Sequence, residues 1–211
     1  MRRLMSSTLP RRLFSTALAP ATGAIALTFD DGPHPDVTPA ILAVLAHLNV
    51  HATFFLIGMR AQRYPDLVRR IAAEGHTLAN HTFTHADPSA ISAAHLSDEV
   101  TRTRQVLQDI AGRNTRLFRP PHGKLTFSKL LRLWSGGHQI VLWNSDPKDF
   151  SCQSRQELES RVRQHTPHAG DIILLHDTAP YTPEVLPEII QTATSRGLSF
   201  VSLADVYRGA A

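Results

Sequence analysis

Short apolar runs alternate with amphipathic stretches along most of the chain. The runs are too continuously apolar to be half exposed, which is typical of strands covered on both faces of a sheet. The stretches between them repeat apolar positions at helical spacing. We therefore predict seven strands: Ala24–Phe29, Ala52–Gly58, His76–Asn80, Leu117–Arg119, Gln139–Trp143, Asp171–Leu175 and Leu198–Val201. This alternation predicts an α/β domain built on a mostly parallel sheet or barrel.

The helices between these strands carry start and stop signals. Two of them are predicted to begin at Thr38-Pro39 and Thr182-Pro183, because threonine is a favoured N-cap and proline fits the first helical turn. A third is predicted to begin at Ser97, with Glu99 in its first turn, and to end at Gly112.

The first 22 residues differ from the rest of the chain. They contain arginine and serine but no acidic residue, and prolines interrupt them, so they lack the apolar core of a secretory signal peptide. We predict a poorly ordered basic tail at residues 1–22, with a transit peptide as the alternative, and one folded domain at residues 23–211.

Composition excludes several classes of protein. The formal net charge is +4, but residues 30–211 carry 18 basic and 18 acidic residues, so nucleic-acid binding through a basic face has no support. No stretch approaches the roughly 20 apolar residues of a membrane span. Cys152 is the only cysteine, which excludes an internal disulfide and a cysteine-based metal cluster.

Polar residues interrupt the pattern just after predicted strands, where α/β folds gather their active-site residues. Asp30 and Asp31 follow the first strand, and adjacent acids at a strand end can serve different partners. His81 and His85 can face one point if their segment forms a helical turn, and imidazole is a good ligand for divalent transition metals. The ordinary alternatives are a solvent-exposed Asp-Gly-Pro turn and a chance pair among 12 histidines.

Three further segments carry candidate chemistry at strand ends. Arg119 is followed by two prolines without N–H groups, so His122 is the first backbone donor after them, and Arg119 can pair with a carboxylate. Asp149 and Phe150 lie beyond the fifth strand, and His176 ends an apolar strand, where a histidine near an aspartate is suited to proton transfer. A solvated arginine and a capping histidine are the alternatives.

Together and in this order, these segments resemble the polysaccharide deacetylase family, also called the NodB-homology or carbohydrate esterase family four enzymes. The resemblance runs from about residue 24 to residue 206. The segments similar to the five family motifs are Thr28–Pro33, His81–His85, Arg119–Gly123, Asp146–Phe150 and Leu174–His176.

The resemblance implies an α/β fold, a distorted and incomplete (β/α) barrel of about seven mostly parallel strands. It also implies one divalent metal held by Asp31, His81 and His85, with zinc as the first choice and cobalt, nickel or manganese as alternatives. Asp30 would take a proton from the attacking water, and Arg119 would keep Asp30 charged.

Five more roles follow from the resemblance. The backbone N–H of His122 would stabilise the oxyanion, and His176, oriented by Asp149, would protonate the departing amine. Leu174 would line a pocket for the acetyl methyl group, and Phe150 would form an aromatic wall. The family usually has tyrosine where His122 stands and tryptophan where Phe150 stands, and both positions border the substrate groove.

The implied activity is hydrolysis of N-acetyl groups on N-acetylglucosamine-type residues of a chitin-, peptidoglycan- or exopolysaccharide-like glycan, with release of acetate. The alternatives are a metal hydrolase of another non-peptide C–N bond and a catalytically silent carbohydrate-binding protein. The glycan is the only partner indicated, and a monomer is expected. The family implies an extracytoplasmic or cell-envelope location, while the lack of a recognised export signal leaves a cytoplasmic location as the alternative.

Overall fold

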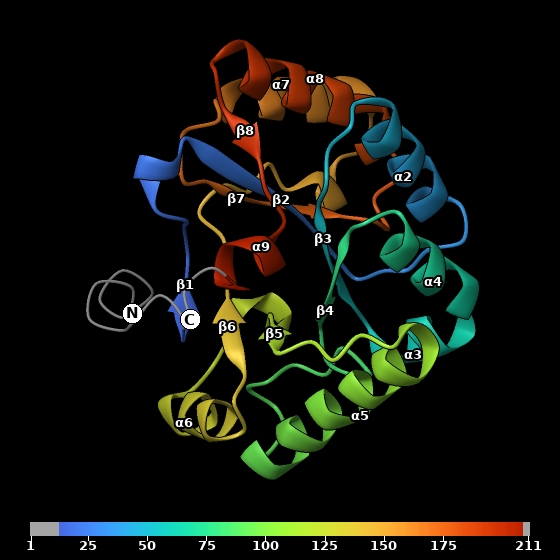
Figure 1. Cartoon of the computed structure of the whole chain (residues 1–211), viewed down its shortest axis with the longest axis vertical. Coiled ribbons are helices and arrows are strands. Elements are labelled where there is room, and N and C mark those ends of the chain that lie inside the picture. Colours follow the sequence, from blue (N-terminus) through green and yellow to red (C-terminus); the bar gives the residue numbers. More distant parts are fainter. Residues whose placement is uncertain (1–12, 209–211) are drawn as a thin grey trace.

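The computed structural model describes residues 13–208, in which a mostly parallel sheet curls into an incomplete barrel (Figure 1). The strands pair in the order β1-β6-β5-β4-β3-β2-β7, and β8 pairs with the start of β2. An isolated bridge between Ser145 and Ile173 links the chain after β6 to β7 and partly closes the barrel. The strands are β1 (Phe14–Ser15), β2 (Ala24–Asp30), β3 (Thr53–Leu56), β4 (Thr77–Asn80), β5 (Leu117–Phe118), β6 (Gln139–Val141), β7 (Ile172–His176) and β8 (Ser199–Phe200).

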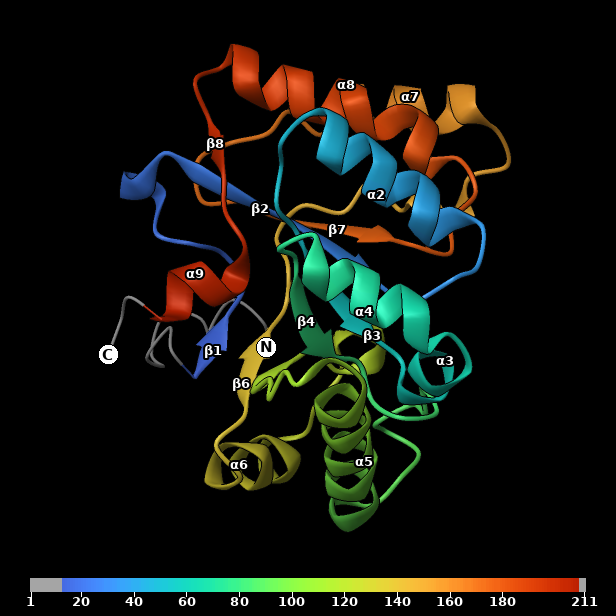
Figure 2. The same ribbon diagram turned by 45° about the vertical axis from the view of Figure 1, so that its right-hand side comes forward.

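Helices cover the outside of this sheet (Figure 2). Helices α2, α7 and α8 pack together over one part of the barrel, while α3, α4, α5 and α6 cover another. The α-helices are α2 (Val37–His47), α3 (Gly58–Arg63), α4 (Pro65–Ala73), α5 (Ala93–Ala111), α6 (Phe127–Ser135), α7 (Arg155–Gln164), α8 (Thr182–Ser195) and α9 (Leu203–Arg208). Short 3-10 helices are η1 (Pro20–Thr22), η2 (Pro121–Gly123) and η3 (Asp149–Ser151).

Strand β2 shows how the sequence divides the two faces of the sheet. All seven of its residues are buried. Because side chains alternate along a strand, Ile25, Leu27 and Phe29 join the core under the helices, while Ala26 joins the core inside the barrel. Thr28 and Asp30 continue the inner row toward the carboxyl end of the sheet. The apolar filling of the barrel thus gives way to polar groups at one end.

The inner core explains why the barrel is packed and not open. It combines residues from several strands with Leu203 of α9, whose backbone N–H donates to Thr53 Oγ1 at the start of β3. Helix α9 therefore covers the amino end of the strands. The carboxyl end is the end that remains for chemistry.

The seven predicted strands are confirmed, with ends that differ by a few residues. The boundary of the tail is wrong for residues 13–22. Phe14 and Ser15 form β1 beside β6, Phe14 and Leu18 are buried, and the Leu18 N–H donates to the Gly170 carbonyl. The open edge of β6 and the two apolar side chains explain this packing. The rest of the predicted tail, residues 1–12, lies outside the described residues.

The helix predicted from Ser97 begins four residues earlier, at Ala93. Ser92 is its N-cap, because the Ser92 side chain accepts a hydrogen bond from the His95 N–H. Its end was predicted correctly, since Gly112 forms the left-handed C-cap with φ of 64°. The earlier start makes Glu99 an interior residue of α5.

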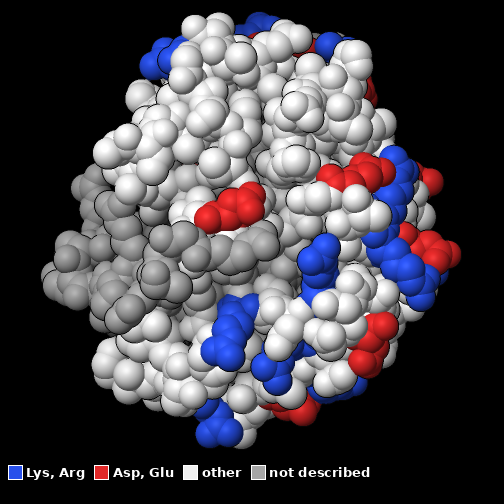
Figure 3. Space-filling model, viewed as in Figure 1, with Lys and Arg blue, Asp and Glu red and all other residues white. Residues whose placement is uncertain are grey.

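The charged surface is mixed in sign along one edge of the molecule. Acidic and basic side chains lie interspersed on the right-hand side of Figure 3, the side on which α4 lies in Figure 1. Helix α4 carries Arg69–Asp66 and Arg70–Glu74 ion pairs, both 2.6 Å long. Within residues 13–208, no helix has both the length and the apolar content needed to cross a membrane.

Candidate active site and metal centre

The end of β2 separates its two adjacent carboxylates. Asp30 is the last residue of the strand and is buried, and its Oδ1 lies 2.7 Å from Arg119 Nη1. Asp31 adopts a left-handed backbone with φ of 75°, which turns its side chain toward the loop after β4. The two acids therefore face different neighbours, since Asp30 pairs with Arg119 and Asp31 faces His81 and His85.

Arg119 is the largest fully buried side chain among residues 13–208. Besides Asp30, its guanidinium donates to Thr28 Oγ1 at 2.8 Å and to the carbonyls of Val141 and Leu142 at 3.1 Å. The guanidinium carbon also lies 4.1 Å from the centre of the Phe55 ring. Burying a charge is costly unless it is paired and hydrogen-bonded, and these contacts meet that condition. Arg119 thus holds Asp30 rigidly.

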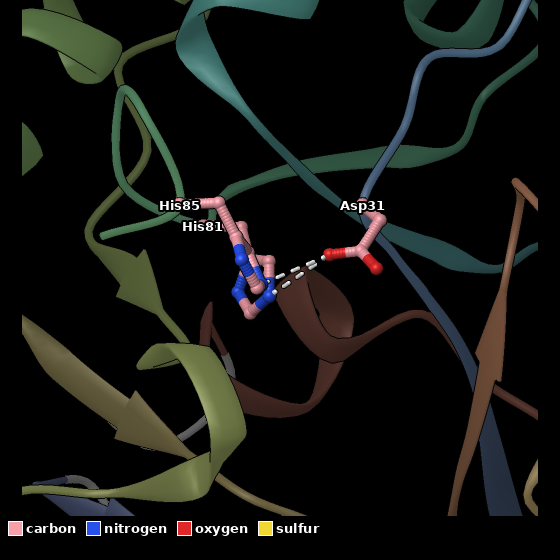
Figure 4. Close-up of side chains that lie close together, drawn as sticks. All are labelled: Asp31, His81 and His85. Carbon is pink, nitrogen blue, oxygen red and sulfur yellow. Dashed lines mark ion pairs between the residues drawn. The ribbon is translucent and has the colours of Figure 1, made fainter. Parts of the chain in front are cut away.

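Asp31, His81 and His85 converge on one point (Figure 4). Asp31 Oδ1 lies 3.5 Å from His81 Nε2 and 3.2 Å from His85 Nε2, and one ligand atom from each residue fits within 4.8 Å of the others. His81 Nδ1 lies 2.8 Å from the Arg119 carbonyl, which can only accept, so Nδ1 carries a proton and Nε2 is the nitrogen that can offer a lone pair to a metal.

The two imidazole nitrogens and the carboxylate oxygen are suited to bind a divalent metal ion. Asp31 Oδ1 is buried without a hydrogen bond, and a cation is the partner that such an oxygen lacks. Burial alone would raise the pKa of Asp31, but the two imidazoles hold that pKa well below its usual range. Burial would lower the pKa of His81, but the charges of Asp30 and Asp31 outweigh burial, so the pKa of His81 is raised. Both shifts reflect a site that attracts positive charge.

The loop that carries the two histidines differs from the sequence expectation. The predicted helical turn is wrong, because residues 81–85 form an irregular loop with positive φ at Thr82 (67°) and His85 (62°). The His81 and His85 rings nevertheless lie 5.0 Å apart, centre to centre. Their shared direction comes from backbone turns and not from helical spacing.

His176 and Asp149 form a second imidazole–carboxylate arrangement on the neighbouring strand. His176 is the register partner of Asp30, and its Nδ1 donates to Asp149 Oδ1 at 2.7 Å. Asp149 also accepts from the backbone N–H groups of His176 and Phe150 and from Thr182 Oγ1. Burial would lower the pKa of His176, but the hydrogen bond and charge of Asp149 raise it to about 9. His176 therefore holds a proton at neutral pH.

The other predicted site residues lie at the same end of the barrel. Leu174 is buried on β7, on the side of the strand that also carries His176, and it pairs with Thr28 in the register. Phe150 is 59% exposed, and its ring meets the His176 ring edge-on at 4.9 Å. The His122 ring lies edge-on to His85 at 5.3 Å. All ten predicted side chains thus gather at one end of the barrel.

Four residues next to this site were not recognised correctly from the sequence. Thr38 and Thr182 lie inside the first turns of α2 and α8, and they are not N-caps; their hydroxyls donate to Asp177 and Asp149 instead. Glu99 and Asp177 are buried acids that were given no role. The signal for Glu99 is its position on the face of α5 that also carries the buried Leu96 and Thr103.

Comparison with known proteins agrees with this site. The sequence model of the polysaccharide deacetylase family matches residues 18–140. The chain belongs to the polysaccharide deacetylase family. It is 34% identical to a peptidoglycan-N-acetylglucosamine deacetylase of Bacillus cereus over 87% of this chain and 88% of the relative. It is 40% identical to a chitooligosaccharide deacetylase of a Bradyrhizobium species over 89% of this chain and 87% of that protein.

Solved structures of family members have the same fold. A crystal structure of the Bc1960 peptidoglycan N-acetylglucosamine deacetylase superposes with a TM-score of 0.88 at 30% identity, covering 92% of each chain. A family 4 pseudoenzyme of Bacillus anthracis superposes with a TM-score of 0.86 at 22% identity, over 95% of this chain and 70% of that one. This last likeness shows that the fold alone does not decide activity, so the catalytic claim depends on the side chains of the site.

Proposed function

We propose that this hydrolase removes N-acetyl groups from N-acetylglucosamine-type residues of a polysaccharide or oligosaccharide and releases acetate. The observation that carries the proposal is the different use of two adjacent carboxylates. Asp31 offers an unpartnered oxygen beside two imidazole nitrogens, while Asp30 is tied to Arg119. A metal-ligand set and a separate base are suited to hydrolysis of an amide by water.

We assign the metal ligands to Asp31, His81 and His85, with zinc as the first choice and cobalt, nickel or manganese as alternatives. When bound, the metal would supply a Lewis acid that polarises the acetyl carbonyl and makes water more acidic. Two imidazoles and one carboxylate leave coordination positions for water and substrate.

Asp30 is the base in this proposal. Its Oδ1 is occupied by Arg119, whereas Oδ2 lies 3.7 Å from His81 Nε2 and therefore faces the metal ligands. A carboxylate held beside the ligand set can take a proton from the attacking water. The ion pair with Arg119 holds this carboxylate in place for the step.

His176 is the acid. Protonated at neutral pH and oriented by Asp149, it can give its Nε2 proton to the sugar amine as the C–N bond breaks. Its neighbour in the register is Asp30, so the base and the acid lie on adjacent strands of one site. In the same proposal, the backbone N–H of His122 stabilises the oxyanion, Leu174 lines the acetyl pocket and Phe150 forms an aromatic wall.

The substrate class follows from the relatives. Chitin-like and peptidoglycan-like glycans are proposed because the matched proteins are named as deacetylases of chitooligosaccharides and peptidoglycan. Such substrates favour an extracytoplasmic or cell-envelope location. The complete set of metal and proton-transfer residues disfavours a silent binding protein, and no feature of the site favours a different amide.

Acetate release tests the proposal directly. Purified protein loaded with zinc would be incubated with N-acetylglucosamine oligomers, peptidoglycan fragments and an N-acetylated exopolysaccharide, and acetate would be measured. We expect release from at least one class, and none from the metal-stripped protein. Absence of acetate with all three classes would reject the proposed reaction.

A further inference from the structure

The loop that carries His81 and His85 is tied to helix α5 through Glu99. Glu99 is only 1% exposed, and its Oε2 accepts three hydrogen bonds from the loop. The donors are the Phe83 N–H at 3.0 Å, the Thr84 N–H at 2.7 Å and Thr84 Oγ1 at 2.9 Å. These residues lie directly before His85, so the carboxylate sets the path of the backbone that delivers this ligand.

Burial of the Glu99 carboxylate has a free-energy cost that a purely structural role does not explain. The imidazole of the half-exposed His95 lies near it, with Nε2 3.8 Å from Oε1. A buried charge without a close ion pair is costly unless hydrogen bonds replace its water. Among residues 13–208, the hydrogen-bond donors to this carboxylate come from the ligand loop. That loop has positive φ values at Thr82 and His85, which are uncommon for residues other than glycine.

The loop that carries Asp31 is held by a second buried acid, Asp177. The Thr38 hydroxyl donates to Asp177 Oδ2 at 2.8 Å and accepts the His34 N–H at 2.7 Å, which fixes the far end of the turn. The Asp177 carboxyl also packs against Gly32, where a Cβ atom would lie 1.8 Å from Oδ2. Only glycine fits there, next to Asp31 and its φ of 75°.

We infer that Glu99 and Asp177 are positioning residues, each of which holds one of the two loops that supply the metal ligands. The inference rests on the proposed metal centre. Neither acid is a metal ligand in it, and Glu99 acts through the backbone N–H groups that donate to it. Asp177 acts through Thr38 and through its packing against Gly32. Loss of such supporting contacts in metal sites commonly weakens metal binding about 10- to 100-fold.

Four variants test the inference with the full chain. Glu99→Met removes the acceptor at similar length, and Glu99→Gln restores an acceptor. Thr38→Val removes the hydroxyl between His34 and Asp177, and Thr38→Ser restores it. Thr53→Val is the matched control, because it deletes one buried hydroxyl that accepts the Leu203 N–H at the amino end of the barrel.

The zinc dissociation constant is measured by competition with a chromophoric chelator, and the visible spectrum of the cobalt-loaded protein reports the ligand geometry. We expect Glu99→Met and Thr38→Val to weaken zinc binding about 10- to 100-fold and to change the cobalt spectrum. Glu99→Gln and Thr38→Ser should recover most of the affinity, and Thr53→Val should bind zinc like the wild type even where it lowers the melting temperature.

The outcomes separate the two claims. Wild-type zinc affinity and an unchanged cobalt spectrum in both Glu99→Met and Thr38→Val would overturn the positioning roles and leave the metal centre intact. Failure of the wild type to bind zinc or cobalt would overturn the metal centre and the inference with it. If Glu99→Met does not fold, the Thr38 pair still decides, because equal zinc affinities of Thr38→Val and Thr38→Ser would reject the positioning of the Asp31 loop.

Discussion

The site contains two imidazole–carboxylate arrangements that differ in which atoms face each other. In the dyad of His176 and Asp149, the carboxylate meets Nδ1 at 2.7 Å, and three other donors complete its hydrogen bonds. In the cluster of Asp31, His81 and His85, two Nε2 atoms surround a carboxylate oxygen that makes no hydrogen bond.

This difference explains how the same residue types do different chemistry. A saturated carboxylate on Nδ1 stabilises the imidazolium form of His176 and leaves its other nitrogen to transfer a proton. Two nitrogens and one unpartnered oxygen around a point instead make a site for a cation. The comparison predicts that changes to the cluster affect metal content and that changes to the dyad affect proton transfer alone.

The largest expected effect is that of His81→Ala. It removes one of the three proposed ligands from the cluster, so both bound metal and acetate release should be abolished. Metal content by elemental analysis and turnover on N-acetylglucosamine oligomers check this. A variant that kept stoichiometric zinc would show that His81 is not a ligand.

His176→Ala comes next. Loss of a general acid commonly costs about 10²- to 10⁴-fold in rate, so kcat should fall by that order while zinc content stays at the wild-type level. Turnover and metal analysis on the same preparation separate the two effects. Loss of zinc from this variant would contradict the division between dyad and cluster.

Asp149→Asn should change the pH dependence of turnover. The raised pKa of His176 keeps its proton until the pH approaches about 9, so wild-type kcat should decline as pH rises through that value. Without the Asp149 charge, burial lowers the pKa, and the decline should move to lower pH. A kcat–pH profile with an unmoved alkaline limb would show that Asp149 does not set the proton affinity of His176.

Phe150→Ala should have the smallest effect. The ring is 59% exposed and touches His176 only by its edge, so the melting temperature should hardly change. If the ring forms a wall of the groove, KM should rise several-fold, in keeping with the ~1 kcal/mol of an aromatic contact. An unchanged KM for oligomers of every length would remove Phe150 from the groove.

The gathering of the candidate site residues could be predicted from the sequence, because the residues proposed as ligands and proton-transfer groups follow strands. Parallel strands bring their carboxyl ends together, so Asp30 and His176 meet although they lie far apart in the chain. Apolar runs also predicted the strands, apart from β1, whose residues Phe14 and Ser15 lie in the segment interpreted as a basic tail.

The supporting residues could not be predicted in the same way. Thr38 and Thr182 satisfy the local rule for an N-cap, and only the folded chain shows that distant carboxylates take their hydroxyls. The direction of His85 depends on positive φ values that helical spacing does not indicate. Local patterns give the strands, whereas these contacts join residues that only the tertiary fold brings together.

The central claim is that Asp31 is a metal ligand and that Asp30 takes a proton from the attacking water. Its most direct test is the zinc content of Asp30→Asn and Asp31→Asn, two identical changes at adjacent positions, together with turnover of each. We predict that Asp30→Asn retains stoichiometric zinc without measurable turnover, whereas Asp31→Asn loses both. Loss of zinc from Asp30→Asn with retention in Asp31→Asn would contradict the account.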